Sequence, residues 1–221
     1  QLGAAEQVAD ARFTLERFRD DPHTHPLGTP SGRIEIFSAT IAGFGYADCI
    51  GHPRWYDRTE LLGHGRYPLH LVSNQPSTRL HSQYDHGITS RTAKIQGREA
   101  ARMNPRDAAH RGIANGQVIR LYNDRGACLA GVQLSEDIRP GVIELPTGAW
   151  FDPLDSRDRA TLEVHGNPNV LTQDVGTSRL AQGSSAHSCL VEAERFDADL
   201  PPVKIFSQPR MRERDSAAGA A

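Results

Sequence analysis

Short runs of apolar residues, several of them alternating with polar residues, are spaced along the chain and separated by turn residues. Alternation with a period of two is typical of a half-buried β-strand, whereas Gly, Pro, Asn and Asp between such runs mark turns. Many short strands with tight turns indicate a compact β-rich barrel rather than alternating βαβ units. The sequence predicts strands at 33–37, 68–72, 117–122, 127–134, 142–145 and 188–195.

Two helices are predicted beside these strands. The first spans 8–19, where apolar residues recur at three- and four-residue steps: Val8, Ala11, Leu15 and Phe18. It ends before Pro22, because the residue preceding a proline is pushed out of the helical region. The second is short, with Asn104 as its N-cap, Pro105 at its first position and Gly112 at its end. Residues 39–66 show no periodicity, and an irregular stretch of that length is usually functional or a contact surface.

Two polar stretches carry the candidate chemistry. At 73–83 the apolar strand before it breaks into amide, hydroxyl, Arg and His side chains, and the end of a strand holds a ligand-binding loop rigidly. Arg79 in this stretch suits a phosphate, although a surface ion pair within a polar turn explains it as well. The second stretch, 165–186, is too polar to be core. It is either an idle surface loop or a wrap around a polar ligand.

Composition narrows the range of functions. A chain of 221 residues, 38% of them hydrophobic, is long enough for one domain with appendages. The formal net charge of -2 gives no electrostatic footprint for nucleic acid, and no apolar run approaches the length of a membrane span. We therefore expect neither nucleic-acid binding nor membrane insertion. Because the sequence starts Gln-Leu-Gly without an initiator Met, we expect a fragment of a longer polypeptide.

Several other chemistries find little support. The three cysteines, Cys49, Cys128 and Cys189, are widely spaced and form no C-x-x-C, so we expect reduced thiols rather than a disulfide framework or a zinc site. The ten histidines are scattered without a metal-ligand spacing, which disfavours a metal-dependent hydrolase. No G-x-S-x-G or Ser-His-Asp pattern indicates a serine hydrolase.

Five motifs occur in one order along the chain. They are TPSGRIEI at 29–36; LVSNQP at 71–76 with RLHSQ at 79–83; MNPRDA at 103–108 with Gly112 and Gly116; NDRG at 123–126; and GNPNVLT at 166–172 with GTS at 176–178. With these motifs the chain resembles the C-terminal domain of molybdopterin oxidoreductases of the dimethyl sulfoxide reductase family. It looks nearest to the biotin sulfoxide and trimethylamine N-oxide reductase branch. The resemblance runs from about residue 10 to about residue 196.

The resemblance implies a fold, a domain organisation and a cofactor. The fold is a β-rich (α+β) six-stranded double-psi β-barrel with short helices and long loops, which agrees with the strand pattern. Residues 1–32 would be a helix and linker left from a preceding domain, 33–200 the dinucleotide-binding barrel and 201–221 a tail. The cofactor would be molybdenum bis(molybdopterin guanine dinucleotide), shared with upstream domains.

The resemblance also implies which residues contact that cofactor. They are Ser73, Asn74, Gln75, Arg79, His81, Ser82, Asn167, Asn169, Thr177, Ser178 and Gln182. Amide side chains suit this role, because they satisfy both the donors and the acceptors on pterin and guanine edges. Catalytic residues are expected elsewhere, since the serine ligand to molybdenum and the substrate funnel of this branch lie upstream. Ser184 and Ser185 are therefore not assigned to the metal.

The implied function is part of an enzyme that reduces S-oxides or N-oxides by oxygen-atom transfer, with this fragment not catalytic by itself. Its partners would be the remaining domains of the parent enzyme and a sulfoxide or N-oxide substrate. Resemblance to biotin sulfoxide reductase favours the bacterial cytoplasm over the periplasm. The alternative is a free-standing double-psi barrel that binds a peptide or protein, which would have no need of amide-rich loops.

Overall fold

The computed structural model describes residues 13–57, 60–158 and 160–208, and their contacts separate them into two compact units. The first unit holds the described residues up to Tyr56 together with Ser178–Leu180. The second holds Asp57–Thr177 and the described residues from Ala181 onward. In the described part of the chain, no helix is long and apolar enough to cross a membrane.

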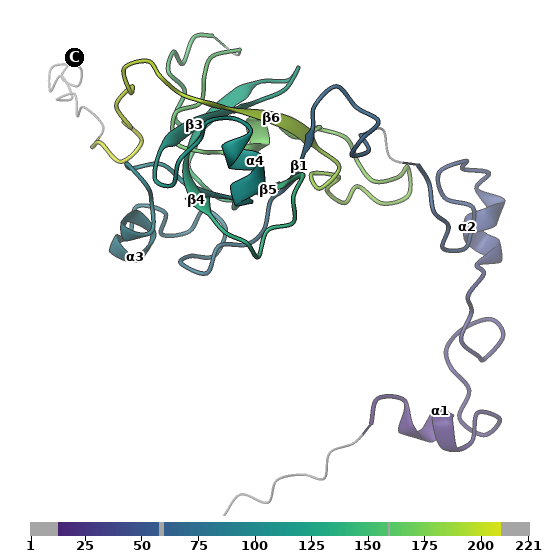
Figure 1. Cartoon of the computed structure of the whole chain (residues 1–221). Coiled ribbons are helices and arrows are strands. Elements are labelled where there is room, and N and C mark those ends of the chain that lie inside the picture. Colours follow the sequence, from purple (N-terminus) through teal and green to yellow (C-terminus); the bar gives the residue numbers. More distant parts are fainter. Residues whose placement is uncertain (1–12, 58–59, 159, 209–221) are drawn as a thin grey trace, which may run out of the picture. The chain divides into compact units, whose positions relative to one another are not determined.

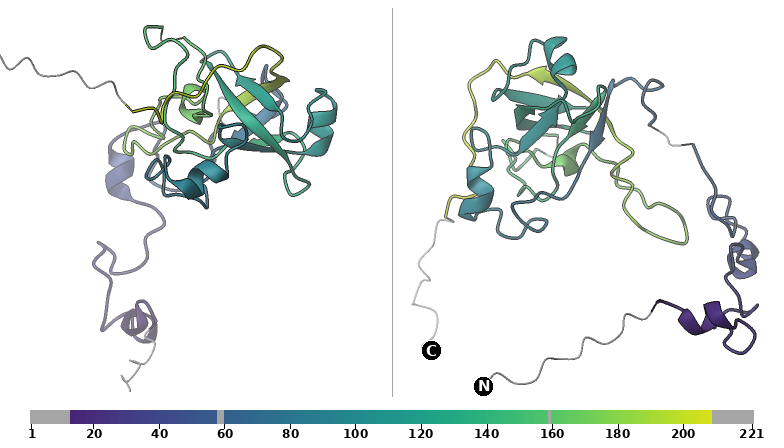
Figure 2. Two further views of the ribbon diagram at one scale, coloured as in Figure 1. Left: turned by 90° about the vertical axis from the view of Figure 1, so that its left-hand side faces the viewer. Right: turned by 60° about the horizontal axis from the view of Figure 1, so that its bottom comes forward.

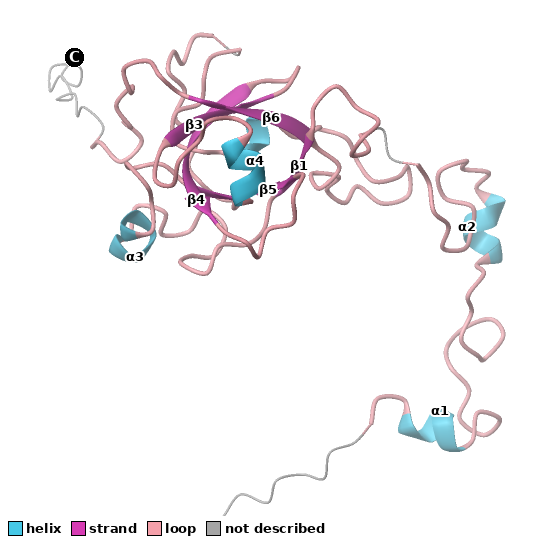
Figure 3. Ribbon diagram, viewed as in Figure 1, coloured by secondary structure: helices cyan, strands magenta, loops and turns pink. Residues whose placement is uncertain are grey.

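Six strands in the second unit form a closed barrel in the order β1-β5-β2-β4-β3-β6 (Figure 3). Pairs β1·β5 and β2·β4 are parallel, and the other four pairs are antiparallel. This arrangement confirms the predicted six-stranded double-psi β-barrel. The strands are β1 (Leu69–Val72), β2 (Ala100–Met103), β3 (Val118–Tyr122), β4 (Ala127–Leu134), β5 (Val142–Glu144) and β6 (Leu190–Arg195).

The strand directions sort the loops between the two ends of the barrel. Strands β1 and β5 are parallel, and β6 is antiparallel to both β1 and β3, so β1, β3 and β5 all finish at one end of the barrel. Strand β2 is antiparallel to β5 and parallel to β4, so β2, β4 and β6 begin at that same end. Both polar stretches singled out in the sequence therefore emerge at that end, which we call the loop end. The other end carries α4 (Pro105–Ala109), as the left view of Figure 2 shows.

The core fills the inside of the barrel and also covers the outside of β4. Strand alternation directs Leu71, Leu121 and Ile143 inward, and all three are fully buried. In β4 both faces are buried, because Leu129 packs with Val118 and Val164 in a second cluster outside. A strand covered on both sides explains the unbroken apolar run at 127–132.

Helix α4 confirms the predicted cap chemistry. The Asn104 side chain accepts the backbone N–H of Arg106 at 2.9 Å, with Pro105 at the first helical position. Its amide also donates to the carbonyl of Ile138 at 2.6 Å, which ties the helix to the turn before β5. Gly112 beyond the helix adopts a φ of 61°. Figure 1 shows α4 across the opening of the barrel.

Replacing Asn104 with Ala is expected to lower the free energy of unfolding by about 1–2 kcal/mol, since the cap and a buried hydrogen bond are both lost. Urea unfolding of the chain measures this change. Asn104→Ser keeps a capping oxygen and loses the donated bond, so it should fall between Ala and wild type. Equal stability of Ala and wild type would contradict the capping role.

The first unit differs from its prediction. Helix α1 (Glu16–Asp20) ends before Pro22 as expected, while residues 8–12 of the predicted helix lie outside the described residues. Helix α2 (Ala39–Gly43), capped by Ser38, lies in a stretch expected to be irregular. The predicted strand at 33–37 is wrong: no strand forms there. Its alternating pattern needs a partner strand and a surface to bury it, and residues 13–56 of this unit supply neither.

Two further differences concern the second unit. Strand β2 was not predicted, because Ala100–Met103 contains no β-branched or aromatic residue. The predicted barrel domain starts at residue 33, whereas the compact unit that holds the barrel starts at Asp57 and its first strand at Leu69.

Candidate functional site

Three loops meet at the loop end of the barrel, and we name each by the element it follows or contains. The β1 loop is 73–83 and the β5 loop is 146–152. The η1 loop is 163–171 and contains a 3-10 turn, Pro168–Val170. Since β1 and β5 are parallel neighbours with Val72 opposite Glu144, the first two loops leave the sheet side by side. The backbone N–H of Thr147 donates to the carbonyl of Asn74 at 2.9 Å and joins them.

The β5 loop lies directly against the β1 loop at Gly148. A Cβ on Gly148 would be 2.0 Å from the carbonyl oxygen of His81, and the residue has a φ of 90°. Only glycine allows both this close approach and this backbone conformation. Beside it, the Trp150 ring nitrogen donates to the Ser82 carbonyl at 2.7 Å. Together these contacts fix the tip of the β1 loop.

The η1 loop is fixed in the same way to the β5 loop. The Asn167 amide donates to the Ala149 carbonyl at 2.9 Å, while its oxygen accepts the N–H of Asn169 at 2.9 Å. The Asn167 side chain is therefore buried and bonded to backbone groups, whereas the neighbouring side chain of Asn169 is exposed to solvent. The β5 loop is the common support of the other two.

A buried carboxyl group, Glu163, shapes the start of the η1 loop. Its oxygens accept four backbone N–H groups at 2.7–3.2 Å, from Asp152, His165, Gly166 and Asn167. Burial raises the pKa of Glu163 to about 7, although the four donors act in the opposite direction. Protonation of this one group is therefore coupled to the stability of the loop.

We expect the free energy of unfolding to fall as the pH rises, because Glu163 loses its proton. Its ordinary pKa is 4.5 and its folded pKa about 7, so its contribution is complete below pH 4.5 and is lost as pH rises to 7. The difference corresponds to about 3 kcal/mol. Urea unfolding between pH 4.5 and 7.5 should show this loss in wild type relative to Glu163→Gln. The exposed-site change Glu136→Gln should keep the wild-type slope, and parallel curves for wild type and Glu163→Gln would refute the coupling.

Beneath the β1 loop lies a buried cluster of four charged side chains, which we call the charge cluster: Arg79, Asp85, Lys94 and Glu99. Lys94 contacts Asp85 and Glu99 at 2.8 Å each, and Arg79 contacts Glu99 at 3.1 Å and Asp85 at 3.5 Å. Burial alone would raise the pKa of Asp85, but hydrogen bonds from Lys94 and the Trp150 N–H hold it below its usual value. Two positive and two negative charges make the cluster neutral.

The Arg79 side chain is buried and bonds to groups inside the protein. Its guanidinium donates to the carbonyls of His81 and Thr147, at 3.0 and 2.9 Å, and to Ser90 at 3.2 Å, besides its carboxylate contacts. Its side chain is 1% exposed. In the described structure Arg79 thus holds the β1 and β5 loops together from below. Its burial contradicts the surface ion pair considered from sequence, whereas its contact with a cofactor phosphate stays a prediction.

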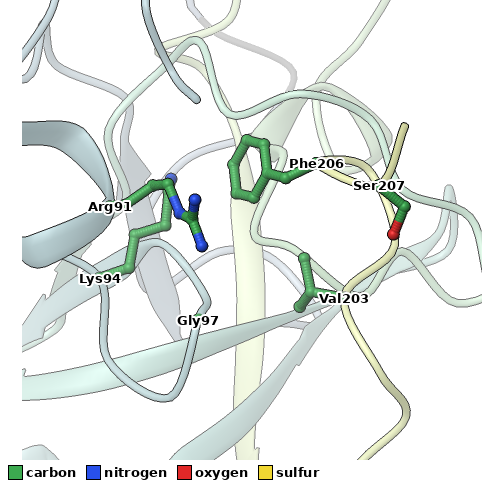
Figure 4. A pocket seen from close by; sticks show the side chains of 6 residues that line it. All are labelled: Arg91, Lys94, Gly97, Val203, Phe206 and Ser207. Atoms are coloured by element: carbon green, nitrogen blue, oxygen red, sulfur yellow. The ribbon is translucent and has the colours of Figure 1, made fainter. Parts of the chain in front are cut away.

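His165 and Phe206 close the charge cluster on its other side. His165 is fully buried, its Nδ1 lies 2.9 Å from the Trp150 carbonyl, and burial and then Lys94 lower its pKa. Phe206 packs edge-on to this ring at 5.0 Å. Beside Phe206 is a cavity of about 400 Å³ (Figure 4). Its lining residues are Arg91, Lys94, Gly97, Val203, Phe206 and Ser207.

The predicted site residues lie in three parts of the structure. Eight of them occupy the three joined loops or their immediate supports: Ser73, Asn74, Gln75, Arg79, His81, Ser82, Asn167 and Asn169. Thr177 and Gln182 are exposed on a separate loop that leads into β6 and is closed by a bridge between Gly176 and Ser184. Ser178 belongs to the first unit.

Asn74 has a buried hydrogen-bonding atom without a partner, as do Arg98 at Nε and His165 at Nε2. The Asn74 amide donates to Glu144 at 3.2 Å, but its side-chain oxygen is buried without a partner. A buried acceptor without a donor costs about 1–3 kcal/mol. A donor from a ligand that reached this oxygen at the loop end would offset that cost.

Sequence reasoning missed the supporting residues. Glu163, Asp85 and Glu99 read as ordinary charged residues, because their partners are distant in the chain and only the fold brings them together. One available signal was the PTGAW stretch at 146–150, where a glycine follows a strand that leads to the predicted site. Among the described residues, no group of three or more His, Cys, Asp or Glu could hold a metal ion.

A closed barrel with rigid, amide-bearing loops at one end is a domain suited to a ligand rich in hydrogen-bonding edges. Residues 69–190 match the family described as Molydopterin dinucleotide binding domain, and the chain belongs to this family. This confirms the resemblance recognised in the sequence. The chain is thus a molybdopterin dinucleotide-binding domain.

The chain is similar to several reductases over most of its own length. It is 50% identical over 87% of its length to the biotin sulfoxide reductase of Cereibacter sphaeroides, of which it covers 26%. It is 48% identical over 88% of its length to the trimethylamine-N-oxide reductase of Salmonella typhimurium, and covers 23% of that protein. It is 45% identical over 87% of its length to the dimethyl sulfoxide/trimethylamine N-oxide reductase of Cereibacter sphaeroides, and covers 24% of that protein. The chain thus spans about a quarter of the length of these relatives.

A solved structure supports the fold. The acetylene hydratase of Pelobacter acetylenicus superposes with a TM-score of 0.62 at 18% identity, over 80% of this chain and 25% of that one. At this identity the likeness extends to the fold alone.

Proposed function

We propose that this chain binds and orients the cofactor in a molybdenum enzyme that reduces S-oxides or N-oxides. The cofactor would be molybdenum held by two molybdopterin guanine dinucleotides, and the compartment the bacterial cytoplasm. Support comes from the 45–50% identity to sulfoxide and N-oxide reductases. The reaction removes one oxygen from the substrate with two electrons and two protons and releases water. The cofactor supplies the two-electron chemistry, while the protein supplies binding and orientation.

The observation that carries the binding role is the unmet oxygen of Asn74 at the junction of the β1 and β5 loops. A pterin or guanine N–H would satisfy it, and Ser73, His81, Ser82 and Asn169 offer further polar atoms on the same three loops. Because Gly148 and Asn167 already fix the loops, little conformational entropy remains to be lost on binding. The chain contributes no residue to the bond-breaking step in this proposal.

Asn74→Ala in the full-length enzyme tests the proposal. We expect the molybdenum and pterin content per polypeptide to fall several-fold, because an acceptor for the cofactor is removed. Asn115→Ala is the matched control, since Asn115 accepts the Leu134 N–H at the opposite end of the barrel and should leave the content unchanged. A wild-type enzyme without pterin would overturn the proposal, and equal content in both variants would remove Asn74 from the site.

A further inference from the structure

The cavity beside Phe206 lies entirely within the second unit and has walls that are already fixed. One wall is α3 (Ile88–Thr92) with the turn after it, and the other is the segment 203–207, which we call the strap. The buried Asp152 carboxylate holds the strap, because it accepts the backbone N–H groups of Lys204 and Ile205 at 2.5 and 2.9 Å. A ligand that enters this cavity therefore has little loop ordering to offset.

Arg91 brings a positive charge to the cavity without a counter-charge. Its side chain reaches from α3 toward Phe206, and its guanidinium carbon lies 5.5 Å from the centre of that ring (Figure 4). Within the described structure no carboxylate forms an ion pair with Arg91, and no Asp or Glu lines the cavity. The other cation of the lining, Lys94, is neutralised by Asp85 and Glu99 at 2.8 Å each. The cavity thus carries one uncompensated positive charge.

The strap presents an apolar wall to this charge. Val203 and Phe206 are both partly buried and lie across the cavity from Arg91 (Figure 4). A matching ligand therefore needs one negative charge and an apolar body. The planar fork of arginine fits the two oxygens of a carboxylate, which carries one charge. A phosphate monoester carries about -1.5 to -2 at neutral pH, which exceeds the single charge available here.

We propose that this cavity binds a small organic carboxylate with an apolar body. Arg91 would pair with the carboxylate, and Val203 and Phe206 would contact the apolar body. The inference goes beyond the proposed function and does not depend on it, because none of the six lining residues is among those assigned to the cofactor.

Isothermal titration calorimetry of the full-length enzyme with hexanoate tests the proposal. We expect saturable binding, and weaker binding of 1-hexanol, which lacks the charge, and of acetate, which lacks the apolar body. Arg91→Met should weaken hexanoate binding about tenfold or more, because a charge-assisted pair is lost. Arg106→Met is the matched control and should bind hexanoate as wild type does. Arg106 is also exposed and lines a cavity beside α4 at the other end of the barrel.

A second variant acts from the opposite wall. Val203→Asp places a carboxylate across from Arg91 and removes part of the apolar wall, so it should also weaken hexanoate binding about tenfold or more. The proposal would be overturned by a wild-type enzyme that does not bind hexanoate, by equal affinity for hexanoate and 1-hexanol, or by unchanged affinity in Arg91→Met.

Molybdenum and pterin are measured in the same preparations, and Arg91→Met should retain both. Loss of the cofactor together with hexanoate binding in Arg91→Met would assign the cavity to the cofactor and overturn the carboxylate site. A wild-type enzyme that binds hexanoate but contains no pterin would overturn the proposed function alone, so the two failures are distinguishable.

Discussion

The Gly148→Ala enzyme is expected to lose most of its bound cofactor and about 2–5 kcal/mol of unfolding free energy. The new Cβ would lie 2.0 Å from the His81 carbonyl oxygen and 2.2 Å from its carbon, and backbone cannot rotate away as a side chain can. A φ of 90° adds about 1–2 kcal/mol for any residue with a Cβ. The β1 and β5 loops must separate to accommodate it. Cofactor content and urea unfolding measure the two effects.

Gly116→Ala is the matched control for this change. Gly116 has a φ of 81°, but a Cβ there would meet nothing within 4 Å. It should therefore show the backbone cost alone, with cofactor content unchanged. If both alanine variants behaved alike, the contact between the two loops would not be what fixes the site.

The sequence was informative wherever local pattern decides structure. Strand β4 and its partner β3 are mostly apolar and are joined by the 123–126 turn, so their hairpin follows from the residues themselves. Asn104 and Pro105 likewise determine where α4 begins. The strand predicted at 33–37 was wrong because alternation states only what a segment would bury, and the surface that buries it must come from elsewhere.

In the candidate site too, local sequence pattern predicts some residues and not others. The polar side chains of the β1 loop could be predicted to lie outside the barrel core, because they directly follow a buried strand. The charge cluster could not, because Arg79 lies twenty residues from Glu99 and sixty-eight from the Thr147 carbonyl it holds. Nor does a single sequence distinguish a buried lysine such as Lys94 from the solvated lysines that are far more common.

Arg79→Met is expected to lower the free energy of unfolding by about 3–5 kcal/mol, because it leaves a net negative charge buried between Asp85 and Glu99. It also frees the carbonyls of His81 and Thr147, so the β1 and β5 loops lose their common anchor. Arg66→Met is the control. Arg66 pairs with Asp124 at 2.8 Å, but both side chains are largely exposed, so its loss should cost less than about 1 kcal/mol.

A second substitution separates positioning from direct contact with the cofactor. Adding Glu99→Gln to Arg79→Met makes the cluster neutral again, with Lys94 left opposite Asp85. If Arg79 supports the loops through the charge balance of the cluster, unfolding free energy and cofactor content should recover together in the double variant. If Arg79 binds the dinucleotide phosphates, stability should recover while cofactor content stays low. Since its guanidinium donates to four groups of this chain, pairs with Asp85 at 3.5 Å and is 1% exposed, we expect the joint recovery.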